Sequence, residues 1–172
     1  MSSKVKICGI TNLEDALDAV DAGADALGFV FYDKSPRHVM VDAAAEIIRR
    51  LPPFVAKVGV FVDATAETVR KAAAECGLDT LQFHGAETPE FCRTFAPLKV
   101  YKAFRVQNLE SLEGLPGYRT DAWLLDGFAP DKPGGTGATF DWGLAREARP
   151  VILTGRGRDP VRRTAWSQGT DE

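Results

Sequence analysis

The chain has 172 residues, of which 45% are hydrophobic and 26% charged, and its net charge at pH 7 is −3. This length fits one ordinary domain, and the composition is typical of a globular protein rather than a disordered one. The charge excludes the basic field that nucleic-acid binding needs, and no apolar run is long enough for a membrane span or a signal peptide. We therefore expect a cytoplasmic protein without nucleic-acid or membrane partners.

Short apolar runs alternate with amphipathic segments along the chain. We predict strands at residues 4–8, 25–31, 54–61, 79–83, 98–104, 121–126 and 149–154. Helices are predicted between them, with N-caps near Asn12, Asp42, Thr65, Thr88, Asn108 and Thr139. This alternation predicts right-handed βαβ units and a parallel sheet. With no sign of reversed strand order, the pattern favours a TIM (β/α)8-type parallel barrel, and it leaves a flavodoxin-like layout open.

Chemically active residue types directly follow the predicted strands. In chain order they are Cys8 and Gly9, the loop 32–38, Asp63, His84 and Gly85, Arg105, Asp126 and Gly127, and Gly155. In a barrel these positions all open onto the face where active sites lie. A thiol, a carboxylate, a guanidinium and an imidazole are therefore expected around one mouth.

Cys8 and Asp126 are the candidate catalytic residues. A lone cysteine is ordinarily a buried packing residue, which is how we interpret Cys76 and Cys92. At a barrel mouth, however, a thiolate acts as a base or a nucleophile. Asp126 is either a turn or cap residue or, if burial favours its neutral form, the complementary proton donor. An acid and a base in one cavity indicate proton-transfer chemistry.

The stretch KPGGTGATFDW, residues 132–142, is a glycine-rich loop that enters a predicted helix. Backbone N–H groups at Gly134, Gly135 and Gly137 would bind an anion such as phosphate, although a flexible connector has the same composition. The loop is not a P-loop, because it lacks GK[ST]. Gly155 follows the seventh strand, where barrels frequently bind phosphate, so we predict that these four glycines form a phosphate site.

Three further residues lie after predicted strands. Arg37 is either a solvated charge or the partner of a substrate carboxylate. His84 is a candidate substrate-binding residue or proton carrier, and a hydrogen bond to a neighbouring loop is the simpler interpretation. Asp63 is interpreted as a turn or cap residue. The three cysteines are odd in number and widely spaced, which predicts neither a disulfide framework nor a zinc site.

The stretches KICGIT, GADALGFVFYDKSPRHV, KVGVFVD, LQFHGAE, LLDGF and GGTGATFDW resemble the phosphoribosylanthranilate isomerase family, in order and spacing, over about residues 4–155. The resemblance implies a (β/α)8 barrel of the tryptophan pathway. It implies an Amadori rearrangement of N-(5-phosphoribosyl)anthranilate to 1-(2-carboxyphenylamino)-1-deoxyribulose 5-phosphate, without a metal or an organic cofactor. Cys8 would be the general base, Asp126 the general acid and Arg37 the partner of the anthranilate carboxylate. The expected partner is this small phosphosugar, bound by a monomer or a homodimer.

The C-terminal part departs from the family pattern. Ala138 stands where the family has the lysine of GGTGK, and residues 154–172, TGRGRDPVRRTAWSQGTDE, contain no apolar run for an eighth strand. We predict one incomplete barrel domain at 1–157, lacking the eighth strand and the final helix. Residues 158–172 would be an Arg-rich tail produced by a frameshift or premature stop near 155–157, which translation of the other two reading frames tests.

Two other functions remain open. An inactive truncated barrel or a non-catalytic phosphosugar-binding domain would bind ligand weakly and would be indifferent to Cys8→Ala. Another barrel enzyme, such as a synthase or an epimerase, is disfavoured because synthases of this kind use lysine and glutamate. Metal-dependent epimerases need His and Asp ligands, and this chain has two histidines.

Overall fold

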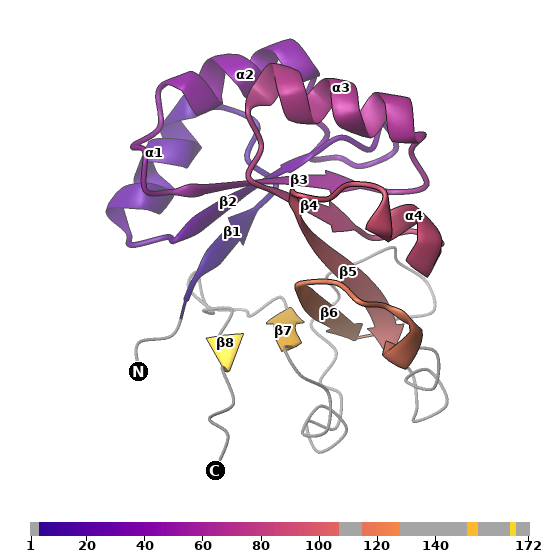
Figure 1. Ribbon diagram of the computed structural model, residues 1–172. Coiled ribbons are helices and arrows are strands. Elements are labelled where there is room, and N and C mark those ends of the chain that lie inside the picture. The colour runs from indigo at the N-terminus through magenta and orange to yellow at the C-terminus, as the bar shows by residue number, and fades with distance from the viewer. Residues whose placement is uncertain (1–3, 107–114, 128–150, 155–165, 168–172) are drawn as a thin grey trace.

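The computed structural model describes residues 4–106, 115–127, 151–154 and 166–167, and its strands form one eight-stranded sheet (Figure 1). The strands are β1 (Lys6–Cys8), β2 (Ala26–Val30), β3 (Ala56–Phe61), β4 (Thr80–Phe83), β5 (Lys99–Val106), β6 (Ala122–Gly127), β7 (Val151–Thr154) and β8 (Trp166–Ser167). Their order in the sheet is their order in the chain. Neighbours from β1 to β7 pair in parallel.

This topology confirms the predicted TIM-barrel type of fold. Each parallel strand is added next to its predecessor, whereas a flavodoxin-like sheet reverses direction at a switch point. The tail contains one described strand, β8, which pairs with β7. Because β8 has two residues and runs antiparallel, it is not the eighth parallel strand of a barrel, in agreement with the prediction that this strand is lacking. Within the described ranges no helix follows β6, and β1 and β8 are the two ends of the sheet.

Four helices connect the first five strands: α1 (Leu13–Asp21), α2 (Val41–Arg49), α3 (Ala66–Cys76) and α4 (Pro89–Arg93). A short 3-10 turn, η2 (Leu115–Gly117), precedes β6. The helices α1, α2 and α3 lie together on one side of the sheet (Figure 1). The predicted helices beginning near Asn108 and Thr139 lie outside the described residues.

Local hydrogen bonds explain where most helices begin. The side chains of Asn12, Thr65 and Thr88 each accept a bond from the backbone N–H three residues later, which satisfies a donor that the first turn leaves free. The predicted cap near Asp42 is displaced, since Met40 holds the cap position and Asp42 lies in the first turn of α2. An acidic residue there still interacts favourably with the helix dipole.

The two faces of the sheet differ in character, because successive side chains of a strand point to opposite sides. The helix-covered face is apolar and contains Leu27, Phe29, Phe61, Leu81 and Phe83, all fully buried. The other face is here called the inner face. It carries Lys6 and Cys8 on β1, Thr80 and Gln82 on β4, and a small apolar cluster on β5 and β6. That cluster consists of Tyr101, Ala103, Ala122 and Leu124. Most buried polar side chains of the strands therefore lie on the inner face, whereas Lys102 of β5 lies on the same face as Phe83.

No helix among the described residues is long and apolar enough to cross a membrane.

Candidate functional site

Cys8 is the last residue of β1, as predicted, and its side chain is half-buried. Gly9 follows with φ +93°, a backbone conformation that glycine adopts without strain. The Arg37 guanidinium donates a hydrogen bond from Nη1 to the Cys8 carbonyl at 3.0 Å. A Cβ on Gly9 would come within 2.5 Å of Arg37 Cδ. The space beside Gly9 therefore receives the Arg37 side chain, which brings the predicted base and the predicted carboxylate partner together.

The packing around Cys8 also depends on Gly28, which pairs with it across β1 and β2. A Cβ on Gly28 would lie 2.7 Å from Cys8 Sγ and 2.9 Å from Lys6 Nζ. Both distances are shorter than real carbon contacts allow. Glycine at this position therefore leaves room for the thiol and the lysine to share the inner face.

Asp126 lies near the end of β6, with backbone partners Arg105 in β5 and Thr154 in β7. It is 5% exposed. Its Oδ2 is 3.6 Å from His84 Nε2, which is a close electrostatic contact but too long for a hydrogen bond. The other His84 nitrogen, Nδ1, is 3.4 Å from Gln82 Nε2. The structure thus places His84 between a β4 side chain and the predicted acid.

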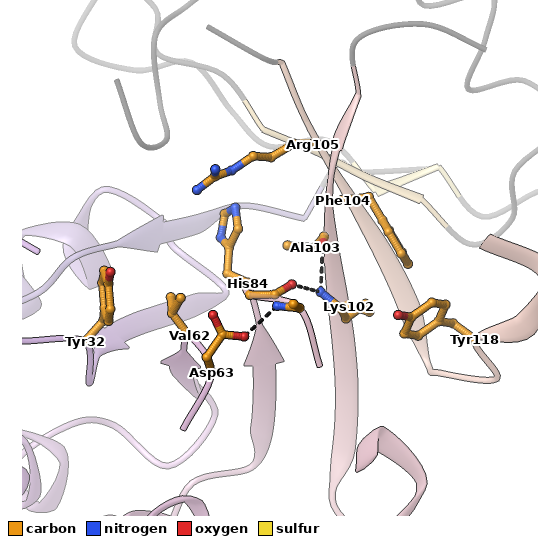
Figure 2. A pocket seen from close by; sticks show the side chains of 11 residues that line it. Tyr32, Val62, Asp63, His84, Lys102, Ala103, Phe104, Arg105 and Tyr118 are labelled. Atoms are coloured by element: carbon orange, nitrogen blue, oxygen red, sulfur yellow. Dashed lines mark hydrogen bonds between the residues drawn. The ribbon is translucent and has the colours of Figure 1, made fainter. Parts of the chain in front are cut away.

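An open hollow of about 480 Å³ lies at the carboxyl ends of β3, β4 and β5 (Figure 2). Its lining includes Tyr32, Asp63, His84, Arg105 and Tyr118. His84 and Arg105 point into the same space in Figure 2. The lining does not include Cys8 or Asp126, but His84 and Arg105 of the lining both adjoin Asp126, His84 through its side chain and Arg105 as the strand partner.

Burial determines the protonation of three other groups. It raises the pKa of Cys76 and of Cys92 to about 11, and both side chains are buried, which confirms that they are packing residues. Burial also raises the pKa of Tyr118 above its ordinary value, so its hydroxyl stays protonated and donates to the Glu87 carbonyl at 2.9 Å. Cys8 differs from the other two cysteines in being half-buried at a strand end.

The remaining predicted residues have mixed outcomes. Asp63 is a turn residue, as predicted: it has φ +50°, and its Oδ1 accepts a hydrogen bond from the Ala86 N–H. The predicted phosphate-binding residues Gly134, Gly135, Gly137 and Gly155 lie outside the described residues. Across the described ranges, no cluster of three or more His, Cys, Asp or Glu residues is arranged to hold a metal ion.

Sequence reasoning missed a buried ion pair behind His84, between Lys102 of β5 and Glu87. One signal was available: Lys102 falls between Val100 and Phe104 on the same side of a strand, which interrupts an apolar face. A lysine at such a position is almost never fully buried unless it is paired.

Parallel strands with a thiol, a carboxylate and an imidazole at their carboxyl ends define a barrel-type enzyme suited to proton transfer. The family model described as N-(5'phosphoribosyl)anthranilate (PRA) isomerase matches residues 5–157. The N-(5'-phosphoribosyl)anthranilate isomerase of Geobacter sp. (strain M21) is 55% identical over 161 residues, which cover 92% of this chain and 78% of that protein.

Solved structures agree. Phosphoribosyl anthranilate isomerase from Thermotoga maritima has a TM-score of 0.84 and 45% identity, covering 90% of this chain and 77% of that one. An isomerase in complex with reduced 1-(o-carboxyphenylamino)-1-deoxyribulose 5-phosphate has a TM-score of 0.79 and 42% identity, with coverages of 90% and 76%. A structure of monomers generated from the dimeric Thermotoga maritima enzyme has a TM-score of 0.78 and 41% identity, covering 90% of this chain and 76% of that one. The chain belongs to the PRA isomerase family.

Proposed function

We propose that this chain catalyses the isomerisation of N-(5'-phosphoribosyl)anthranilate to 1-(2-carboxyphenylamino)-1-deoxyribulose 5-phosphate in tryptophan biosynthesis. Family membership supports the reaction. The observation that carries the proposal is the position of Cys8 and Asp126, each at the carboxyl end of its strand in one barrel-type sheet. This is the end at which barrel enzymes bind their substrates.

In the proposed reaction, Asp126 and Cys8 each carry out one proton transfer. Asp126 donates a proton to the furanose ring oxygen as the C1′–O bond breaks, which leaves a Schiff base at C1′. Cys8, as the thiolate, removes the proton from C2′, and the electron pair moves to give an enolamine. The enolamine then gains a proton at C1′ and loses the proton of its 2′-hydroxyl, which gives the ketone of the product. General acid and base catalysis of this kind contributes about 10²–10⁴-fold in rate for each group.

Other residues of this chain would hold the substrate. Arg37 is exposed and already directed at the Cys8 carbonyl, so its guanidinium lies where a carboxylate beside Cys8 would meet it. An arginine makes two parallel hydrogen bonds with a carboxylate. His84 would contact the substrate from the hollow, and the backbone N–H groups of Gly134, Gly135, Gly137 and Gly155 would bind its phosphate.

The test is the loss of substrate fluorescence when the purified chain meets freshly made phosphoribosylanthranilate. We expect turnover in the wild-type chain and a loss of about 10²–10⁴-fold in Cys8→Ala. Cys92→Ala is the matched control, because this thiol is buried behind the site. Turnover that is equal in Cys8→Ala and wild type would contradict the proposed base.

One observation favours the alternative of an inactive truncated barrel. The first strand lies at an end of the sheet, and its Ile7 side chain is 36% exposed. An open edge is a site for self-association or aggregation. Absence of turnover from folded, soluble chain would support this alternative, and weak phosphosugar binding that is indifferent to Cys8→Ala would support a non-catalytic binding domain.

We further propose that the chain is cytoplasmic, that it acts as a monomer or a homodimer, and that its domain spans residues 1–157. The dimeric relative supports the homodimer, and the match to the family model ends at residue 157. Light scattering of the purified chain decides between the two oligomeric states. Limited proteolysis that removes 158–172 without loss of thermal stability would support the domain boundary.

A further inference from the structure

The turn after β4 is held by four side chains, here called the clamp: Asp63, Glu87, Lys102 and Tyr118. Of these, Asp63, Lys102 and Tyr118 also line the hollow. The Glu87 carboxylate accepts hydrogen bonds from the Asp63 N–H and the Gly85 N–H, both at 2.9 Å. Asp63 in turn accepts a bond from the Ala86 N–H at 2.6 Å. The Tyr118 hydroxyl donates to the Glu87 carbonyl at 2.9 Å. Backbone groups of the turn are thus fixed on several sides.

Lys102 completes the clamp from β5. Its Nζ donates to the carbonyl oxygens of Gly85 at 2.8 Å and Ala103 at 2.9 Å, and it lies 3.3 Å from Glu87 Oε2. Figure 2 shows Lys102 directed at the turn below His84. The exposed fractions are 2% for Lys102 and 6% for Glu87. This is a desolvated ion pair in which both charges are hydrogen-bonded to the backbone.

Stability alone does not account for such a pair. Taking two charges out of water costs several kcal/mol for each ion, and replacement of a buried pair by apolar residues is often neutral or stabilising. The pair is useful where it fixes one backbone arrangement among several. Here the arrangement that it fixes is the turn that begins with His84.

We propose that Glu87 and Lys102 are positioning residues that hold the His84–Gly85 turn so that His84 faces Asp126. His84 immediately follows β4, and its Nε2 is 3.6 Å from Asp126 Oδ2. The clamp grips the next residue, Gly85, by both its N–H and its carbonyl. The Gly85 N–H belongs to the peptide that joins His84 to Gly85, so the clamp fixes the backbone from which the His84 side chain projects. The inference rests on the proposed function, in which Asp126 is the proton donor.

The test combines kinetics with the imidazole nitrogen signals of His84 in ¹⁵N-labelled protein. The chain has two histidines, so His38→Gln assigns the signals. In Lys102→Met we expect kcat to fall about 10- to 100-fold, as displaced catalytic geometry does, and KM to rise because the contact of His84 with the substrate is displaced as well. We also expect the two His84 nitrogen signals to shift. A merely structural role lowers thermal stability without moving those signals.

Lys57→Met is the matched control. Lys57 is also a strand lysine in an ion pair, with Asp79 at 3.1 Å. It lies near the amino end of β3, away from the carboxyl ends of the strands where His84 lies. We expect this variant to keep the His84 signals and kcat of the wild type. If Lys102→Met does not fold, two other variants replace it: Glu87→Gln/Lys102→Met, which removes both charges of the pair, and the milder Tyr118→Phe. Their His84 signals and kcat are compared with those of the wild type in the same way.

The outcomes separate the two proposals. A folded clamp variant with wild-type His84 signals and wild-type kcat overturns the positioning role. If the wild-type chain shows no turnover, the proposed function has failed, and the nitrogen signals alone decide whether the clamp orients His84. Shifted signals together with a lower kcat in an active chain support both proposals.

Discussion

Cys8, the proposed base, ends β1, and His84 directly follows β4, so both lie at the carboxyl ends of their strands, but the structure holds them in different ways. Cys8 ends a strand of three residues that has one neighbour among the described strands, and an exposed Arg37 makes a hydrogen bond to its carbonyl. His84 follows a strand that lies between β3 and β5, and a buried ion pair fixes the turn behind it. A central strand offers neighbours on both sides from which such a network is built, and an end strand does not.

The difference predicts that the side chains around His84 and Asp126, here called the acid side, are held in one arrangement. The side chains around Cys8, here called the base side, are expected to shift more readily when their neighbours change. Four experiments test this comparison, beginning with the largest expected effect.

Asp126→Asn removes the proposed acid while preserving shape in a buried position. We expect turnover to fall about 10²–10⁴-fold, because an amide cannot supply the carboxyl proton. The measurement is kcat from substrate fluorescence, with thermal unfolding as the check on folding. Wild-type turnover in this variant would mean that another group protonates the ring oxygen.

Gly28→Ala adds a methyl group on the base side, next to Cys8, and Gly85→Ala adds one on the acid side, next to His84. At Gly28 it would meet Cys8 Sγ, and at Gly85 it would meet the Asp63 carboxylate. Overpacking of this kind costs about 1–3 kcal/mol in the free energy of unfolding. We expect the larger loss of stability for Gly85→Ala, since β1 at the end of the sheet has more freedom to relax. Urea unfolding measures both, and equal losses would argue against the difference between the sides.

Arg37→Lys keeps the positive charge but removes the planar fork that pairs with a carboxylate. We expect KM to rise about tenfold, equivalent to about 1.4 kcal/mol of binding, with little change in kcat. Arg49→Lys, on the exposed side of α2, is the control. If KM does not change in Arg37→Lys, the substrate carboxylate binds elsewhere.

Thiol labelling gives the smallest perturbation. At pH 8, iodoacetamide should modify Cys8 first, because Cys76 and Cys92 are buried and their pKa values are raised to about 11. Raised pKa values mean that both thiols favour the folded state below about pH 9. This contribution is lost as pH rises toward 11, because the unfolded chain ionises first. Mass spectrometry of the labelled peptides gives the order, and fast reaction at Cys92 would show that this core opens.

The sequence predicted the strands and the first helices closely, because their signals are local. The capping side chains of Asn12, Thr65 and Thr88 act within one helical turn, and apolar runs mark β2, β3 and β4 within a residue or two. The order of parallel strands followed from the alternation with helices. The residue types at the strand ends were readable for the same reason, since each lies next to its own strand.

Tertiary structure alone decided which of these residues meet. Glu87 and Lys102 are 15 positions apart, and they pair because β4 and β5 are neighbours with Phe83 opposite Lys102. Arg37 reaches Cys8 from the loop after β2, and the two-residue β8 pairs antiparallel with β7, which no local pattern predicted. Such contacts depend on the curvature and register of the whole sheet. A local pattern therefore determined what chemistry this chain carries, and long-range packing determined how that chemistry is arranged.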